Sequence, residues 1–133
     1  GEIIIYPVTD HYSNPYPSYE EKAKGYALSS DLMRWFWDTY LGFKGSNGSV
    51  PVITTPIHAP NLASLPPTLL ITAEHDPLRD EGRAYADKLR ARGVAVHYSH
   101  YKDAAHGFAS SAGASPDFHQ LMDEIGNWIA RLD

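Results

Sequence analysis

Residues 65–82 read LPPTLLITAEHDPLRDEG, in which a short apolar run follows two prolines and ends among acidic side chains. An uninterrupted apolar run such as residues 69–73 is typical of a strand that is buried on both faces, as in a parallel sheet covered by helices. Asp80 and Glu81 follow it, and acidic residues favour the first turn of a helix. The segment therefore predicts a strand that leads directly into a helix.

Similar signals recur on both sides of this unit. Residues 3–6 (IIIY) and 94–98 (VAVHY, continuing to residue 101) predict two further strands. Helices are expected at residues 29–41 and from residue 115 onward, where apolar side chains recur every three or four positions. Residues 29–31 can cap the first of these helices and Gly42 can end it. A further helix is expected at 80–92, which begins with acidic residues and ends with basic ones before Gly93. Strands that alternate with helices predict an α/β fold, here with about three parallel strands and flanking helices.

The composition limits the kinds of partner. The chain has 133 residues, 43% of them apolar, and a formal charge of −5. Such a length suits one domain, and an acidic chain without basic runs is unsuited to nucleic acid or an anionic membrane. No apolar run approaches the roughly 18 residues of a membrane span. The absence of cysteine excludes disulfides, thiolate zinc sites and a cysteine nucleophile, and it favours the cytoplasm.

The first predicted strand, residues 3–6, is apolar enough to require partners on both edges. As the outermost strand of a three-stranded sheet it would be prone to aggregation. We therefore expect its edge to be covered, either by further strands from an upstream part of the protein or by a partner chain, for example in a homodimer.

Two polar residues follow neighbouring predicted strands. Asp76 comes after the strand at 69–73, and His106 comes after the strand that begins at residue 94. Parallel strands bring such loops to the same end of a sheet, where α/β proteins place their sites. A carboxylate beside an imidazole can hold its tautomer and stabilise its charged form. Because any two such loops meet in this way, the spacing alone leaves a structural reading open.

The residues themselves resemble those of hormone-sensitive-lipase-type esterases, which are α/β-hydrolases of the acetyl esterase and arylesterase kind. The resemblance is carried by residues 65–82, Tyr85-Ala86, Leu89, Gly93-Val94, Tyr101, His106-Gly107-Phe108 and, upstream, residues 5–10, 25–26, 35–37 and 40–42. It implies that residues 1–133 are the C-terminal half of one α/β-hydrolase domain, with residues 11–64 as a cap-like insertion. It further implies that Asp76 is the acid and His106 the base of a catalytic triad.

The chain departs from that family in one large respect. The nucleophile requires Gly-x-Ser-x-Gly and the oxyanion hole a His-Gly-Gly-type loop, and neither motif is present. The nearest segments, residues 44–48 and 109–113, lack the first glycine. In this family the serine precedes the acid and the base, so it would lie upstream. We expect the isolated chain to be inactive on esters, because triad members act as a unit.

Several other residues are candidates for binding or for structure. Trp35, Phe36, Trp37 and Tyr40 of the insertion are candidates for the substrate pocket, with core packing as the alternative, above all for Phe36 and Tyr40. Phe108, beside His106, is a candidate for the mouth of the pocket or for packing. Three consecutive rings at 35–37 cannot all face one side of a helix. Arg79, Asp80 and Glu81 fit structural roles at a helix start. The seven histidines lack the spacing of metal ligands, so no metal or other cofactor is expected.

The leading hypothesis is therefore the C-terminal portion of a serine carboxylesterase or lipase-like hydrolase of short- to medium-acyl esters. An alternative is a non-catalytic truncated module that self-associates, or binds a partner, through the strand at 3–6. A third possibility is a split enzyme whose other chain supplies the serine.

Overall fold

The computed structural model describes residues 1–14, 16–22, 24–42, 49–110 and 115–132. Three parallel strands form a sheet in the order β1-β2-β3: β1 (Glu2–Ile5), β2 (Thr68–His75) and β3 (Val96–Ala105). The helices are α1 (Pro17–Glu21), α2 (Ser30–Leu41), α3 (Arg79–Ala91) and α4 (Pro116–Ile129), with short 3-10 helices η2 (Val52–Thr54), η3 (Pro56–His58), η4 (Leu62–Ser64) and η5 (Phe108–Ser110). The predicted α/β class, with three parallel strands and flanking helices, is confirmed.

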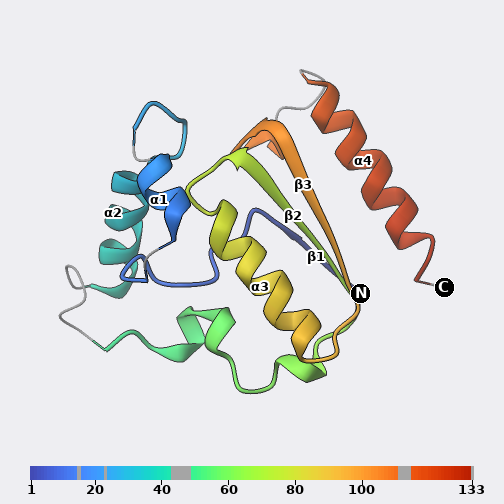
Figure 1. The fold of residues 1–133 in the computed structure, drawn as a ribbon, viewed down its shortest axis with the longest axis horizontal. Coiled ribbons are helices and arrows are strands. Elements are labelled where there is room, and N and C mark those ends of the chain that lie inside the picture. Colours follow the sequence, from blue (N-terminus) through green and yellow to red (C-terminus); the bar gives the residue numbers. More distant parts are fainter. Residues whose placement is uncertain (15, 23, 43–48, 111–114, 133) are drawn as a thin grey trace.

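The sheet lies between two layers of helix, with α3 on one face and α4 on the other (Figure 1). Alternate side chains of β2 serve the two layers. Leu70 packs with Tyr85 and Leu89 of α3, whereas Leu69 and Ile71 belong to the cluster that contains Leu121 of α4. Burial on both faces explains why β2 reads as a continuous apolar run and not as an alternating one.

The approach of α3 to the sheet depends on Gly82. A Cβ atom at this position would lie 2.9 Å from Cγ2 of Thr72 on β2 and 3.7 Å from Cδ of Pro7, which follows β1. Real Cβ atoms do not approach other carbons so closely, so glycine lets the first turn of α3 rest directly on the strands. This first turn of α3 directly follows the loop that carries Asp76.

Helix α2 has the termini that its sequence predicts. The Ser29 hydroxyl accepts a hydrogen bond from Leu32 N at 3.2 Å, and Gly42 ends the helix with φ of 73°. Of the three consecutive rings, Trp37 is 5% exposed and Trp35 is 58% exposed. Of the two alternatives for Phe36 and Tyr40, core packing is excluded, because they are 46% and 73% exposed.

Residues 11–64 connect β1 to β2 and contain α1, α2 and η2 to η4. Ser18 of α1 attaches this segment to the turn between β2 and α3: its hydroxyl donates to Pro77 O at 2.6 Å and its amide to Asp80 Oδ2 at 2.9 Å. Leu78 of the same turn is buried in a cluster with Tyr19 of α1 and Trp37 of α2. The insertion thus places α1 and α2 beside the end of β2 (Figure 1). Its cap-like role stays a prediction.

Candidate active site

Asp76 lies directly after β2, at the carboxyl end of the sheet, and its side chain is fully buried. One carboxylate oxygen, Oδ1, accepts a hydrogen bond from Leu78 N at 2.8 Å, and the Asp76 carbonyl accepts one from Arg79 N at 3.2 Å. These bonds form the tight turn that leads into α3 and fix the carboxylate in one orientation. The second oxygen, Oδ2, points to the end of β3.

His106 follows β3, and its imidazole meets that carboxylate: Nδ1 lies 2.7 Å from Asp76 Oδ2. A carboxylate only accepts hydrogen bonds, so Nδ1 carries the hydrogen, and in the neutral imidazole Nε2 has the lone pair. The backbone is also tied, because His106 N donates to His75 O at 3.2 Å. Gly107, with φ of 91°, supplies the turn after the histidine. The two loops therefore converge, as the parallel topology predicts.

An irregularity in the strand pairing sets the position of His106. Ala73 pairs with Tyr101 and His75 with Ala105, so β2 advances two residues (75 − 73) while β3 advances four (105 − 101). The extra residues bend the end of β3 and re-aim the loop that carries His106, as bulges do beside active sites. Hydrophobic patterning of the sequence gives no sign of this shift.

The environment of the pair suits an acid that orients a base. The Asp76 side chain is 1% exposed and the His106 side chain 26% exposed. Within the part of the chain that the structure describes, His106 Nε2 makes no hydrogen bond. The arrangement leaves Nε2 free to accept a proton from a hydroxyl group, and the buried carboxylate would stabilise the resulting imidazolium.

One aromatic ring touches the imidazole. The Tyr6 ring, which follows β1, lies with its centroid 4.4 Å from that of His106 and 6.0 Å from that of Phe108. Phe108 is buried and packs in turn against Tyr101 of β3, at 4.9 Å. The sequence singled out Phe108 but not Tyr6, although the place of Tyr6 between a strand and a proline at the carboxyl end of the sheet was a usable signal.

Ion pairs stabilise the turn between β2 and α3. Arg79 contacts Glu74 of β2, Glu21 of α1 and Asp80, each at 2.8 Å. Desolvation disfavours the ionised form of Glu74, but Arg79, His100 and Lys22 outweigh it and hold its pKa below the ordinary value. Arg79 thus joins three elements at the start of α3, in the structural role that the sequence suggested.

Glu81 is a buried carboxyl group in the first turn of α3. Its Oε1 accepts a hydrogen bond from Thr9 N at 2.6 Å and a longer one from Asp10 N at 3.3 Å. Burial raises the pKa of Glu81 to about 8 and outweighs these two amides, which favour the ionised form. The residue ties the segment after β1 to α3.

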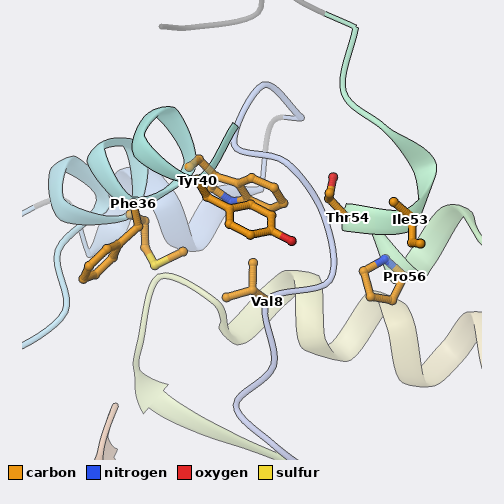
Figure 2. A pocket seen from close by; sticks show the side chains of 8 residues that line it. Val8, Phe36, Tyr40, Ile53, Thr54 and Pro56 are labelled. Carbon is orange, nitrogen blue, oxygen red and sulfur yellow. The ribbon is translucent and has the colours of Figure 1, made fainter. Parts of the chain in front are cut away.

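A cavity of about 310 Å³ lies between α2, the segment after β1 and the region of η2 (Figure 2). Its lining is mainly apolar and consists of Val8, Met33, Phe36, Trp37, Tyr40, Ile53, Thr54 and Pro56. Trp37, a predicted pocket residue, belongs to this lining. Trp35 does not, and its ring packs on Phe36 at 5.2 Å. The exposed Phe36 and Tyr40 also belong to this lining.

The described residues hold no group of three or more histidine, cysteine or carboxylate side chains placed to bind a metal ion. His97 and His100 face opposite sides of β3, where they contact Glu124 of α4 and Glu74 of β2. No helix in the described ranges is both long and apolar enough to cross a bilayer. Residues 44–48 and 111–113, compared above with the serine motif, lie outside the described residues.

The sequence of this chain is similar to those of known proteins. A family model described as the alpha/beta hydrolase fold matches residues 1–110. Carboxylesterase NlhH of Mycobacterium tuberculosis is 36% identical, over 98% of this chain and 40% of that protein. Ethyl acetate hydrolase of Pseudomonas putida is also 36% identical, over 80% of this chain and 33% of that protein.

Solved structures agree with these matches. An esterase of the fungus Rhizomucor miehei aligns with a TM-score of 0.85 at 38% identity, covering 97% of this chain and 40% of that chain. Esterase LipW of Mycobacterium marinum aligns with a TM-score of 0.84 at 29% identity, covering 97% and 39%. The chain thus spans 33% to 40% of the length of these relatives.

Proposed function

The chain belongs to the α/β-hydrolase fold family, and on this premise we propose that it supplies the acid and the base of a serine carboxylesterase, as the C-terminal part of that enzyme. The observation that carries the proposal is the 2.7 Å contact between His106 Nδ1 and the buried carboxylate of Asp76 at the carboxyl ends of adjacent parallel strands. The names of the relatives, a carboxylesterase and an ethyl acetate hydrolase, support carboxylic esters as the substrate class.

In this mechanism the nucleophile is a serine of the upstream part. As its hydroxyl oxygen attacks the ester carbonyl, His106 Nε2 takes the hydroxyl proton, and Asp76 stabilises the imidazolium. His106 then gives the proton to the leaving alcohol, which leaves an acyl-serine. Water, deprotonated by His106, attacks the acyl group, and the proton returns to the serine as the carboxylic acid departs. No metal or cofactor takes part.

We further propose that the apolar cavity beside α2 accommodates part of a short- to medium-acyl ester. Trp37 lines it, and its volume of about 310 Å³ is at the small end of the range for ligand pockets. Trp35 and Phe108 remain candidates for the pocket once the upstream part is present. A location in the cytoplasm stays a prediction, which cell fractionation would test.

The test of the proposal is hydrolysis of p-nitrophenyl butyrate with and without an upstream polypeptide that carries a Gly-x-Ser-x-Gly turn. We expect no turnover by the chain alone, turnover by the mixture, labelling of the serine by a fluorophosphonate, and loss of turnover with His106→Ala. Hydrolysis by the chain alone that His106→Ala abolishes would contradict the proposal, because the chain would then contain its own nucleophile.

A second candidate function is a non-catalytic module that self-associates through β1. The supporting observation is that β1 is an outer strand of the sheet, although its three isoleucines are apolar. A stable homodimer that never reacts with the fluorophosphonate, in the presence or absence of the upstream polypeptide, would favour the module. Labelling with restored turnover from two separate natural chains would favour a split enzyme.

A further inference from the structure

Tyr6 combines two unusual features at the end of β1. Its φ of 38° is positive, and it is the only non-glycine residue with a positive φ among the residues described. A bulky side chain in this region of backbone space costs energy and persists where the surroundings impose it. Its ring is also the one that packs against the His106 imidazole, at 4.4 Å between centroids and 54° between planes.

The surroundings hold the Tyr6 ring firmly. Its amide donates to Ile71 O at 2.7 Å, which anchors the residue to β2, and Pro7 restricts the chain directly after it. The ring centroid of Phe108 lies 6.0 Å from that of Tyr6, and Phe108 is itself buried against Tyr101. A series of aromatic contacts therefore connects Tyr101, Phe108 and Tyr6 to the partly exposed imidazole.

We propose that Tyr6 is a positioning residue for the reaction, whose ring holds the His106 imidazole in the orientation that keeps Nδ1 on Asp76; this rests on the proposed esterase function. The Asp76 hydrogen bond fixes one point of the imidazole and leaves rotation about that bond open. The Tyr6 ring, tilted by 54° against the imidazole at 4.4 Å between centroids, blocks this rotation.

The first test uses NMR of the 133-residue chain, without serine or ester. The readouts are the ring-current shift of the His106 ring protons and the exchange with water of the Nδ1 proton bonded to Asp76. In Tyr6→Phe both stay unchanged, because the Tyr6 hydroxyl makes no hydrogen bond within the described residues. In Tyr6→Gly the ring-current shift is lost and Nδ1 proton exchange becomes about fivefold faster.

Tyr6→Gly separates positioning from a merely structural role. Glycine adopts a φ of 38° without strain, so this variant keeps the backbone while it removes the ring. Tyr6→Asn is the second ring-less variant, because asparagine also tolerates positive φ. Tyr98→Leu is the matched control: Tyr98 is a half-buried tyrosine of β3 that packs in the cluster on the α3 face, and its loss leaves both readouts unchanged.

Two results of the NMR experiment would overturn the proposal directly: a wild-type chain without the ring-current shift, or a folded Tyr6→Gly chain whose Nδ1 proton exchanges at the wild-type rate. If Tyr6→Phe folds but both ring-less variants unfold, the ring serves core packing and the positioning role is likewise rejected.

In the mixture with the upstream polypeptide, Tyr6→Gly lowers kcat about fivefold and leaves KM unchanged, because Tyr6 does not line the cavity. A rise in KM with kcat unchanged contradicts the proposal. If the wild-type mixture shows no turnover, the esterase function fails while the NMR result for Tyr6 still stands.

Discussion

The two carboxylate oxygens of Asp76 have different partners, Leu78 N and His106 Nδ1, and one substitution separates their effects. In Asp76→Asn the side-chain oxygen still accepts from Leu78 N, so the turn keeps its shape. The amide then donates to His106 Nδ1 and moves the imidazole hydrogen to Nε2, where it blocks proton acceptance. We predict a loss of kcat of about 10⁴-fold in the mixture with the upstream polypeptide, measured as p-nitrophenyl ester hydrolysis.

The matched control is Asp87→Asn, the same change at an exposed position of α3, which leaves turnover unaltered. Circular dichroism of both variants checks that the fold is kept. A loss smaller than about tenfold for Asp76→Asn would contradict its role as the triad acid.

Glu81 makes the stability of the chain depend on pH. Its pKa is raised from 4.5 to about 8 by burial, so the folded chain holds a proton that the unfolded chain releases above pH 4.5. The contribution of Glu81 to folding is therefore fully present below pH 4.5 and is lost as the pH rises to about 8. We predict that the urea midpoint falls across this window.

Glu81→Gln provides the comparison, since the amide keeps an acceptor for Thr9 N and does not titrate. Its urea midpoint should fall less with pH than that of the parent chain. If the urea midpoints of both chains fall equally with pH, Glu81 is not the group that causes the pH dependence.

Replacement of glycine by alanine should have opposite effects on stability at Gly82, where α3 contacts β2, and at Gly126 of α4. Gly82→Ala places a methyl group 2.9 Å from Thr72 Cγ2, so α3 must shift, at a cost of about 1–3 kcal/mol in the free energy of unfolding. Gly126→Ala in α4 meets no atom within 4 Å and should gain about 0.5–1 kcal/mol. Urea unfolding measures both. Stabilisation by Gly82→Ala would show that the close approach is absent.

The elements that the sequence predicted are those with a local cause. The three apolar runs became β1, β2 and β3, and Ser29 and Gly42 cap the two ends of α2. Helix α1 was not predicted, because five residues carry no helical period; contacts of Ser18 and Tyr19 with the β2–α3 turn stabilise it. Such contacts join residues about 60 positions apart and leave no local signal.

The same distinction applies to the candidate site. Strand order is enough to place Asp76 near His106, and the resemblance adds their chemical roles. The bulge that aims His106, the ring of Tyr6 and the bonds from Glu81 to Thr9 all depend on side chains meeting across the sheet. Periodicity likewise identified the apolar face of α2, but it could not show that Phe36 and Tyr40 border a cavity instead of the core.

The outer edge of β1 carries backbone amides that point away from β2. Glu2 N and Tyr6 N donate toward β2, to Pro67 O and Ile71 O, so the amides of Ile3 and Ile5 point to the other side. Among the described residues no strand pairs with that side. We predict that the chain alone forms species larger than its 14.8 kDa in light scattering after gel filtration.

Two proline substitutions in β1, with opposite expected results, test whether the chain associates through this edge. Ile3→Pro removes an outward amide, which an edge strand tolerates, and should yield a folded monomer. Ile4→Pro removes an amide that faces β2 and should unfold the chain. Association that persists in folded Ile3→Pro would exclude β1 as the contact surface.

The groups that hold His106 come from β1, β2 and the turns after them: the Asp76 carboxylate, the His75 carbonyl and the Tyr6 ring. This has a consequence for gene recombination among esterases. A crossover placed just before β1 would exchange donors of the nucleophile and keep acid and base in register. A crossover between β2 and β3 would combine the aspartate of one parent with the histidine of another. The turn after β2 and the bulge in β3 would then also come from different parents. Chimeric libraries should therefore be richer in active members at the first junction than at the second.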